Sequence, residues 1–291
     1  MLGAASATPG LWDWSFDPPL ALVVLVGILY WIGDRRTVAP ERTRRERRWR
    51  GVCFYAGLAT VVIALDSPLD ALSEQLFWAH MVQHVLLLVV APPLIVIARP
   101  WIRVWRSLPL STRQSLGRGL GQGERAAPLR YISRTLGRPA ASFVLFSGVL
   151  LVWHVPALFD ATLRSSAVHA LEHTLFFSTA LLFWKQVLPS PPLHARLAPV
   201  QRVGYLIGAM IVSWILAVVL ALAPHPLYAH YAHEATRPGG ISALADQQIA
   251  AGIMWVPGSI TFLIVMFAYV HRWLSPSAPA SARVTRLAGE H

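Results

Sequence analysis

The sequence contains little cysteine and little charge. Cys53 is the only cysteine among 291 residues, so a disulfide within the chain and a Cys-x-x-Cys metal or redox motif are both excluded. Charged residues make up 13% of the chain, about half of the roughly 25% that is typical of soluble domains. Hydrophobic residues make up 55%. This composition excludes a disordered protein and an ordinary soluble domain, and any metal site must use ligands other than thiolates.

Lysine is almost absent, and the positive charge is carried by arginine. Lys185 is the single lysine, although the chain has 25 basic residues and a formal net charge of +11. Such a charge normally suggests nucleic-acid binding, but these arginines lie in short blocks between long apolar runs. No basic stripe alternates with stacking aromatic residues. We therefore expect no nucleic-acid partner, and interpret the arginines as loops of a protein that lies in a lipid bilayer.

Seven apolar stretches approach the roughly 20 residues that a transmembrane helix requires. The first stretch is not preceded by the basic residues of a secretory signal, so we expect it to be retained as a helix. No repeat and no separate soluble domain is visible, so residues 1–291 are expected to form a single integral membrane domain with a flexible cytoplasmic tail over 275–291. The predicted fold is an all-α membrane protein, a seven-transmembrane helix bundle with spans near residues 18–33, 51–66, 76–98, 140–159, 166–188, 201–223 and 248–274.

The charge distribution predicts how these spans are oriented, because lysine and arginine accumulate in cytoplasmic loops. Alternate segments hold 23 of the 25 basic residues, and the segments between them hold only Arg164 and Arg237. Nine of the 14 acidic residues lie in those intervening segments. We predict an outer N-terminus, a cytoplasmic C-terminus and a multi-pass protein of the bacterial inner membrane. The cytoplasmic segments would be 34–50, 99–139, 185–202 and 271–291.

In this orientation, eight of the 11 histidines lie on the outer side. Five of them, at the ends of three spans, are expected in one layer roughly 5–12 Å below the outer boundary. Four of these histidines form two pairs, and the two members of each pair are four residues apart. Each pair therefore shares a helix face, with a spacing typical of metal ligands. Ionisable groups within a membrane usually face the bundle interior. We therefore predict a metal site formed by His80, His84, His154, His169 and His173.

Three further polar residues are candidates for accessory roles in this layer. Gln83 and Glu172 lie beside the paired histidines, and Asp246 begins the last span on the same side. Each can act as an additional ligand or as a group that orients an imidazole. Asp246 also has an alternative role as the N-cap of its own helix.

Two methionines and the outer loop provide other metal-binding atoms. Met81 and Met254 offer soft sulfur, although apolar packing is the more frequent role of methionine. The loop between the sixth and seventh spans contains His225, His230 and His233. These three residues are candidates for a route by which metal reaches the site, with solvated loop residues as the simpler interpretation.

The residue types favour copper but leave other functions open. Imidazole suits copper, zinc, iron and nickel, and the Irving–Williams order favours copper. Facing histidines can also hold haem, which would indicate a haem-binding or electron-transfer membrane protein. His169-x-x-Glu172-His173 matches the pattern of inverted zinc proteases, which would indicate a zinc-dependent membrane metallopeptidase with Glu172 as general base. A proton-coupled transporter is disfavoured, because almost no ionisable residue lies in the cytoplasmic half of the spans.

Several stretches together resemble the CtaG-like cytochrome c oxidase assembly factors. The resemblance covers approximately residues 15–275, and its specificity lies in the order of the motifs on the seven predicted spans. The motifs are Asp66-Ser-Pro-Leu-Asp70, His80-Met-Val-Gln-His84 running on to Ala91-Pro-Pro-Leu94, Trp153-His-Val-Pro156, His169-Ala-Leu-Glu-His173 with Phe183-Trp184, and Asp246-Gln-Gln-Ile-Ala-Ala-Gly252 with Met254-Trp255.

The resemblance implies a non-enzymatic membrane factor that matures a haem-copper terminal oxidase. It implies copper as the metal handled, with oxidase subunits as partners and a periplasmic copper donor as a further partner. A single-span copper chaperone with cysteine ligands shares the family's name, but this chain has neither that architecture nor those cysteines. The positions that match the family's motifs are His80, His84, His154, His169, His173 and Asp246.

Overall fold

The computed structural model describes residue 14 and residues 18–37, 44–193, 195–234 and 237–275. The expected tail beyond residue 275 lies outside them. The regular secondary structure of the described residues is helical, apart from one β-bridge between Ser190 and Leu193. The helices are α1 (Pro18–Arg35), α2 (Arg44–Leu65), α3 (Pro68–Gln75), α4 (Phe77–Val85), the π-helical turn η2 (Leu86–Val90), α5 (Ala91–Ala98), α6 (Trp101–Ser107), α7 (Leu110–Gln122), the 3₁₀ turn η3 (Glu124–Ala126), α8 (Ala127–Leu136), α9 (Pro139–Trp153), α10 (Pro156–Arg164), α11 (Ser166–Val187), α12 (Pro199–Leu222), α13 (Ala229–His233), the 3₁₀ turn η4 (Pro238–Gly240) and α14 (Ala243–Leu274).

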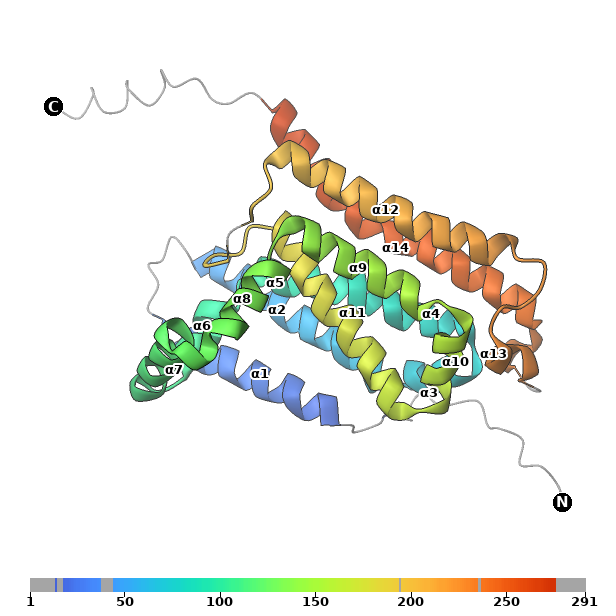
Figure 1. The fold of residues 1–291 in the computed structure, drawn as a ribbon, viewed down its shortest axis with the longest axis horizontal. Coiled ribbons are helices and arrows are strands. Elements are labelled where there is room, and N and C mark those ends of the chain that lie inside the picture. The colour runs from blue at the N-terminus through green and yellow to red at the C-terminus, as the bar shows by residue number, and fades with distance from the viewer. Residues whose placement is uncertain (1–13, 15–17, 38–43, 194, 235–236, 276–291) are drawn as a thin grey trace.

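The long helices run side by side (Figure 1). Helices α12 and α14 form a pair on one side, and α1 lies on the opposite side. Between them, α4 packs on α14, α9 packs on α11, and α5 packs on both α2 and α11. Short helices α3, α10 and α13 gather at one end of the bundle, and α6, α7 and α8 gather at the other end.

Four helical stretches of the described chain are long and apolar enough to cross a membrane. They are α2, α12, α14 and the continuous run Phe77–Ala98. The run Glu124–Leu136 and helix α9, bent by 79° at the break between them, would make a fifth. Helices α1, α9 and α11 occupy the other predicted stretches. The prediction of an all-helical protein with several membrane spans is confirmed.

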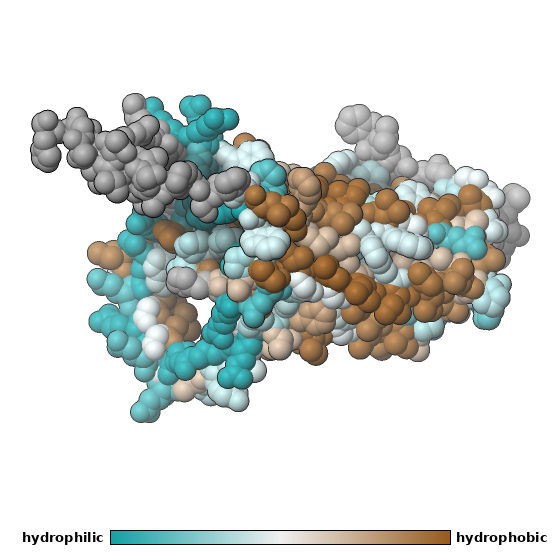
Figure 2. All heavy atoms as spheres, turned by 90° about the horizontal axis from the view of Figure 1, so that it is seen from above, coloured by the Kyte–Doolittle hydropathy of each residue, from teal (hydrophilic) through white to brown (hydrophobic). Residues whose placement is uncertain are grey.

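The surface of the bundle agrees with a lipid environment. Large apolar side chains face outward along the helices, such as Val144 on α9, Leu222 on α12 and Phe267 on α14, each at least two thirds exposed. In Figure 2 the hydrophilic side chains gather at the end formed by α6, α7 and α8, while apolar side chains cover much of the rest of this face. Polar ends and apolar flanks are what a bilayer requires of a helix bundle.

The predicted fourth span, residues 140–159, is divided into two helices. Helix α9 ends at Trp153, and α10 begins at Pro156. Proline disfavours the helical conformation of the residue before it, and Val155 is accordingly extended, with φ −66° and ψ 125°. Hydrophobicity continues across this break, so the apolar pattern of the sequence did not predict it. His154 therefore lies at the end of α9 rather than within a span.

The run from Phe77 to Ala98 continues through a proline pair by forming a π-helical turn. Pro92 has no N–H group, so it cannot donate to the carbonyl of Leu88, its α-helical acceptor. The turn η2 widens the helix here, and the indole N–H of Trp184 donates to that carbonyl at 2.8 Å. This bond joins α11 to the run that begins with α4, and so positions the two helices that carry the site.

Candidate metal centre

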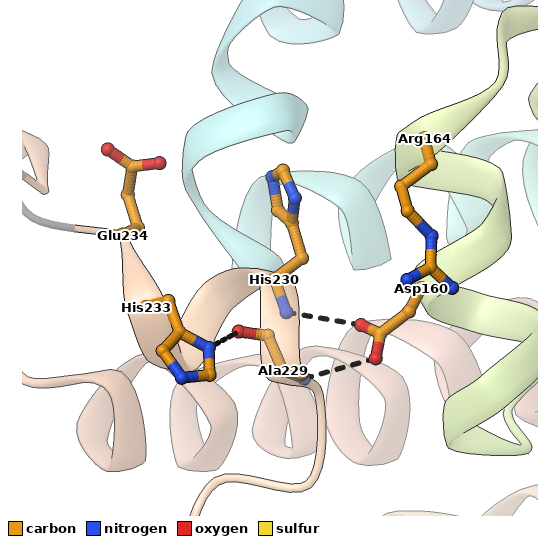
Figure 3. Close-up of a pocket in the computed structure, with 6 residues that line it drawn as sticks. All are labelled: Asp160, Arg164, Ala229, His230, His233 and Glu234. Carbon is orange, nitrogen blue, oxygen red and sulfur yellow. Dashed lines mark hydrogen bonds between the residues drawn. The ribbon is translucent and has the colours of Figure 1, made fainter.

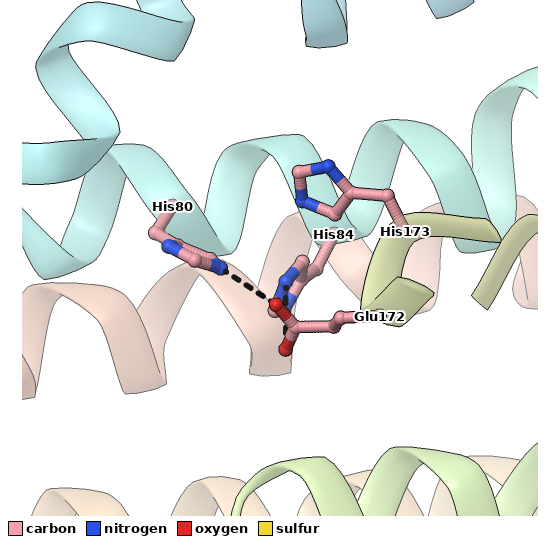
Figure 4. Close-up of side chains that lie close together, drawn as sticks. All are labelled: His80, His84, Glu172 and His173. Atoms are coloured by element: carbon pink, nitrogen blue, oxygen red, sulfur yellow. Dashed lines mark ion pairs between the residues drawn. The ribbon is translucent and has the colours of Figure 1, made fainter. Parts of the chain in front are cut away.

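Four buried side chains converge between helices α4 and α11 (Figure 4). His80 and His84 lie one turn apart on α4, and Glu172 and His173 are neighbours on α11. One ligand atom from each lies within 4.8 Å of the others. Atoms bound to one tetrahedral ion at about 2.0–2.1 Å lie roughly 3.3 Å apart, so modest side-chain rotations bring all four to bonding distance. We name these four residues the His/Glu cluster.

Glu172 lies at the centre of the His/Glu cluster. Its carboxylate points between two imidazole rings, with Oε2 at 3.5 Å from His80 Nε2 and Oε1 at 3.5 Å from His84 Nε2. These contacts are too long for good hydrogen bonds. Neither carboxylate oxygen has a hydrogen-bond partner among the described residues, and neither do the Nε2 atoms of the three histidines. A buried carboxylate without hydrogen-bond partners is costly, so this arrangement is suited to holding a cation.

The two other predicted histidines lie against the cluster. The His169 ring is 4.2 Å from the His173 ring and 5.1 Å from the His80 ring, centroid to centroid. The His154 ring is 5.8 Å from the His84 ring. The structure thus brings all five predicted histidines into one group, although His154 and His169 contribute no atom to the four-residue set. His169 differs from the others in being only partly buried.

The imidazole of His154 also contacts a methionine. Its Nδ1 lies 2.7 Å from the carbonyl of Leu150, which can only accept, so the proton must be on Nδ1. The unprotonated Nε2 then faces the sulfur of Met81 at 3.4 Å. The His154 Nε2 and the soft Met81 sulfur, two atoms that can bind a metal, therefore lie next to the cluster with no proton between them. For Met81 the sequence favoured packing, because nothing in it shows that residues 73 positions apart would meet.

Tyr231, from α13, determines which nitrogen of His80 faces the cluster. Its hydroxyl donates to the carbonyl of Ser73 at 2.5 Å and lies 3.3 Å from His80 Nδ1. Burial, with the carboxylates of Asp246 and Glu172 nearby, raises the pKa of the Tyr231 phenol well above its usual value, so the phenol keeps its proton. The phenol donates its single proton to the Ser73 carbonyl, so toward His80 its oxygen can only accept. His80 therefore donates from Nδ1, and its Nε2 is left unprotonated and able to bind a metal.

Aromatic side chains close the site against water. Phe159, on α10, is fully buried and lies 4.9 Å from the His80 ring. Phe176, one turn beyond the cluster on α11, lies 4.5 Å from the His84 ring. A low-polarity surround would strengthen the attraction between the Glu172 carboxylate and any cation held there.

The predicted accessory residues have structural partners. Asp246 accepts from the backbone N–H groups of Phe77 and Trp78, both at 2.9 Å, and so caps α4. Its own helix is capped instead by the hydroxyl of Ser242. Gln83 donates to the Ala64 carbonyl at 2.6 Å and to an Asp70 carboxylate oxygen at 2.8 Å, so it ties α4 to α2 and α3. Met254 is packed in the main hydrophobic core.

Two of the loop histidines, His230 and His233, line a separate pocket (Figure 3). This cavity of about 350 Å³ lies between α10 and α13 and is bordered by Asp160, His230, His233 and Glu234. His230 Nε2 contacts the Glu74 carbonyl at 3.0 Å, and His233 Nδ1 contacts the Ala229 carbonyl at 2.6 Å. His225 is exposed before α13.

A helical membrane bundle with a buried His/Glu cluster is the class of protein that these observations define. The chain matches the model of the cytochrome c oxidase caa3 assembly factors over residues 28–275, and it belongs to this family. The resemblance seen in its motifs is thereby confirmed. Together with the apolar helices and the mycobacterial relatives, this membership identifies a multi-pass bacterial membrane protein.

Individual relatives are distant and longer than this chain. An uncharacterised protein of Mycobacterium bovis is 26% identical over 278 residues, and one of Mycobacterium leprae is 23% identical over 285 residues. Each alignment covers 94% of this chain but 41% of the relative. No solved structure matches the chain.

Proposed function

We propose that this protein assists the assembly of a haem-copper cytochrome c oxidase by binding copper in the His/Glu cluster and passing it to an oxidase subunit. Membership of the caa3 assembly-factor family supports the assembly role. The observation that carries the metal role is the set of buried donor atoms without hydrogen-bond partners, centred on Glu172. Copper is the cargo in this proposal, the role is non-enzymatic, and a periplasmic copper donor loads the site.

The donor set favours copper among the metals that imidazole binds. Three imidazoles and one carboxylate suit Cu(II) or zinc, whereas a thioether sulfur suits Cu(I). The Met81 sulfur and His154 Nε2 lie beside the cluster, 3.4 Å apart, and extend the set toward the softer ion. A site of this mixed character can hold copper in either oxidation state, which suits a protein that receives and releases it.

The packing of the site favours a bare ion over haem. Neighbouring imidazole rings of the cluster are 4.4–5.9 Å apart, and Phe159 and Phe176 fill the adjoining space. A haem between axial imidazoles needs a planar slot across the whole macrocycle. The described residues pack together where such a slot would have to lie.

Metal analysis of the purified protein tests the proposal. We expect wild-type protein equilibrated with Cu(I) without oxygen, or with Cu(II) in air, to retain about one copper per chain, because four ligands close one tetrahedral site. His80→Ala and His173→Ala each remove one ligand, from a different helix in each case. Each variant should retain less than about a tenth of the copper that the wild type retains. His271→Ala, at the exposed end of α14, serves as the matched control and should bind as wild type.

Oxidase assembly provides the second readout. In a strain lacking this protein, wild type and His271→Ala should restore the copper content of the oxidase, whereas His80→Ala and His173→Ala should not. Absence of copper from the wild-type protein, or full restoration by both cluster variants, would contradict the proposed role.

We also propose that all seven predicted stretches cross the membrane, with the cluster near the outer face. The basic helices α6, α7 and α8 lie at the opposite end of the bundle from α10 and α13, which supports this orientation through the preference of arginine for the cytoplasm. The seven helices α1, α2, α4 to α5, α9, α11, α12 and α14 would provide the spans.

Cysteine labelling tests this topology, because Cys53 is buried and can be replaced by serine. In that background, we expect His233→Cys to react with a membrane-impermeant maleimide in intact spheroplasts. Arg118→Cys, on exposed α7, should react only after lysis. The reverse pattern would place the cluster on the cytoplasmic side.

A further inference from the structure

The far side of the bundle from α12 and α14 carries a groove that has no part in the metal site. It lies between α1 and α2, with a volume of about 480 Å³, and apolar side chains such as Val24, Ile28 and Leu58 line it. Gly27 also lines it, because the missing side chain leaves this part of α1 open. The groove faces outward, where the apolar flank of the bundle meets lipid.

The groove continues into a basic pocket. This second cavity, of about 340 Å³, is lined by Arg44, Arg47 and Arg48 at the start of α2. Trp31 and Tyr55 border both cavities, which makes the two continuous. Trp31 and Tyr55 are each nearly half exposed, as aromatic residues at a membrane interface are.

Arginines outnumber carboxylates among the described residues that line the pocket. Asp34, the one acidic residue among the described residues that line the pocket, is held by Arg47 at 2.8 Å and by Arg103 on α6 at 2.8 Å. Arg35 adds a further cation, stacked over the Trp31 ring at 4.1 Å. Within the part of the chain that the structure describes, exposed Arg48 has neither a hydrogen bond nor an ion pair. The pocket is therefore complementary to an anion.

We propose that this groove and pocket bind one anionic phospholipid from the leaflet at the basic end of the bundle. The phosphate would lie against Arg48, with the charge of Arg44 beside it, since guanidinium groups pair with phosphate through two parallel N–H bonds. An acyl chain would lie in the groove along α1, beside Gly27. Basic groups attract anionic lipid at a membrane surface, and the adjoining apolar groove selects a lipid over a dissolved anion. The site is independent of the proposed copper function.

Native mass spectrometry of the full chain, with defined lipids added to the delipidated protein, tests this site. We expect wild type to retain one dioleoyl phosphatidylglycerol in preference to dioleoyl phosphatidylcholine, and to retain no glycerol phosphate. Arg44→Ala and Arg48→Ala should each weaken that binding about fivefold, the effect of one basic residue near an anionic surface. Arg45→Ala removes the same charge from an exposed neighbour that does not line the pocket, and should bind as wild type.

The groove has its own test. A side chain at Gly27 would begin 3.5 Å from Leu58, an ordinary contact, so Gly27→Ala should fold and bind as wild type. Gly27→Phe would fill the groove and should abolish retention of the dioleoyl lipid. Equal retention of the two dioleoyl lipids, equal losses in the Arg45→Ala and Arg48→Ala variants, or a dimer bound through this face would each overturn the proposal.

Discussion

Glu172→Gln is expected to release copper from the His/Glu cluster while leaving the fold intact. The substitution keeps the shape of the side chain but removes the negative charge that faces His80 and His84 at 3.5 Å. Removing an outer partner of a metal ligand already lowers metal affinity by roughly 10–100-fold, and Glu172 lies among the ligands themselves. We therefore expect a loss of about 100-fold or more, measured by competition with a copper chelator.

In the metal-free protein, the same substitution should preserve or raise thermal stability. A buried carboxylate without hydrogen-bond partners costs stability, so the thermal unfolding midpoint of metal-free Glu172→Gln should equal or exceed that of wild type. Glu74→Gln, at an exposed position of α3, is the charge-matched control and should bind copper normally. Retention of zinc by Glu172→Gln, with loss of a peptidase activity present in wild type, would support the metallopeptidase interpretation instead.

Asp246→Ala is expected to destabilise the start of helix α4. The carboxylate accepts two backbone N–H bonds, from Phe77 and Trp78, and is itself fully buried. Without it, two first-turn N–H groups lose their acceptor at a buried helix end. We expect the free energy of unfolding to fall by about 2–3 kcal/mol, since hydrogen bonds to charged groups contribute roughly 1.5–3 kcal/mol each and desolvation offsets part of this. Denaturation of the purified protein measures this change.

Asp246→Asn provides the matched control, because it keeps one side-chain oxygen in place. This variant should lose less stability than Asp246→Ala and should still bind copper at the wild-type stoichiometry, because Asp246 acts on α4 rather than on the metal. If Asp246→Asn unfolds as wild type but no longer binds copper, Asp246 is a ligand and its capping role is secondary.

The histidine layer could be predicted from the sequence because it depends on local geometry. Residues four apart share a helix face whatever the tertiary structure, so the pairs on α4 and α11 followed from spacing alone. The distribution of basic residues among the loops predicted the orientation of the spans, and this orientation put both pairs and His154 at similar depths. Five histidines that face the interior of one bundle at the same depth must lie close together, and the structure brings them together.

The groups that orient those histidines could not be predicted in the same way. Asp246 caps a helix whose first residue is 169 positions earlier, and the Tyr231 hydroxyl meets His80 across 151 positions. Such contacts depend on which helices are neighbours, which a single sequence does not determine. The division of the predicted fourth span at Pro156 was visible in the sequence as a proline, but continuous hydrophobicity across it concealed the break.

The partial exposure of His169 has a kinetic consequence. His80, His84, Glu172 and His173 are almost entirely shielded, and Phe159 and Tyr231 cover them from α10 and α13. Under the proposed copper role, an ion that reaches the surface at His169 would be one imidazole away from the interior, and would move inward by exchanging one ligand at a time. In this proposed role, loading and unloading through successive ligand exchange would never release a bare ion, so a site that binds copper tightly would still transfer it quickly to an acceptor docked beside His169.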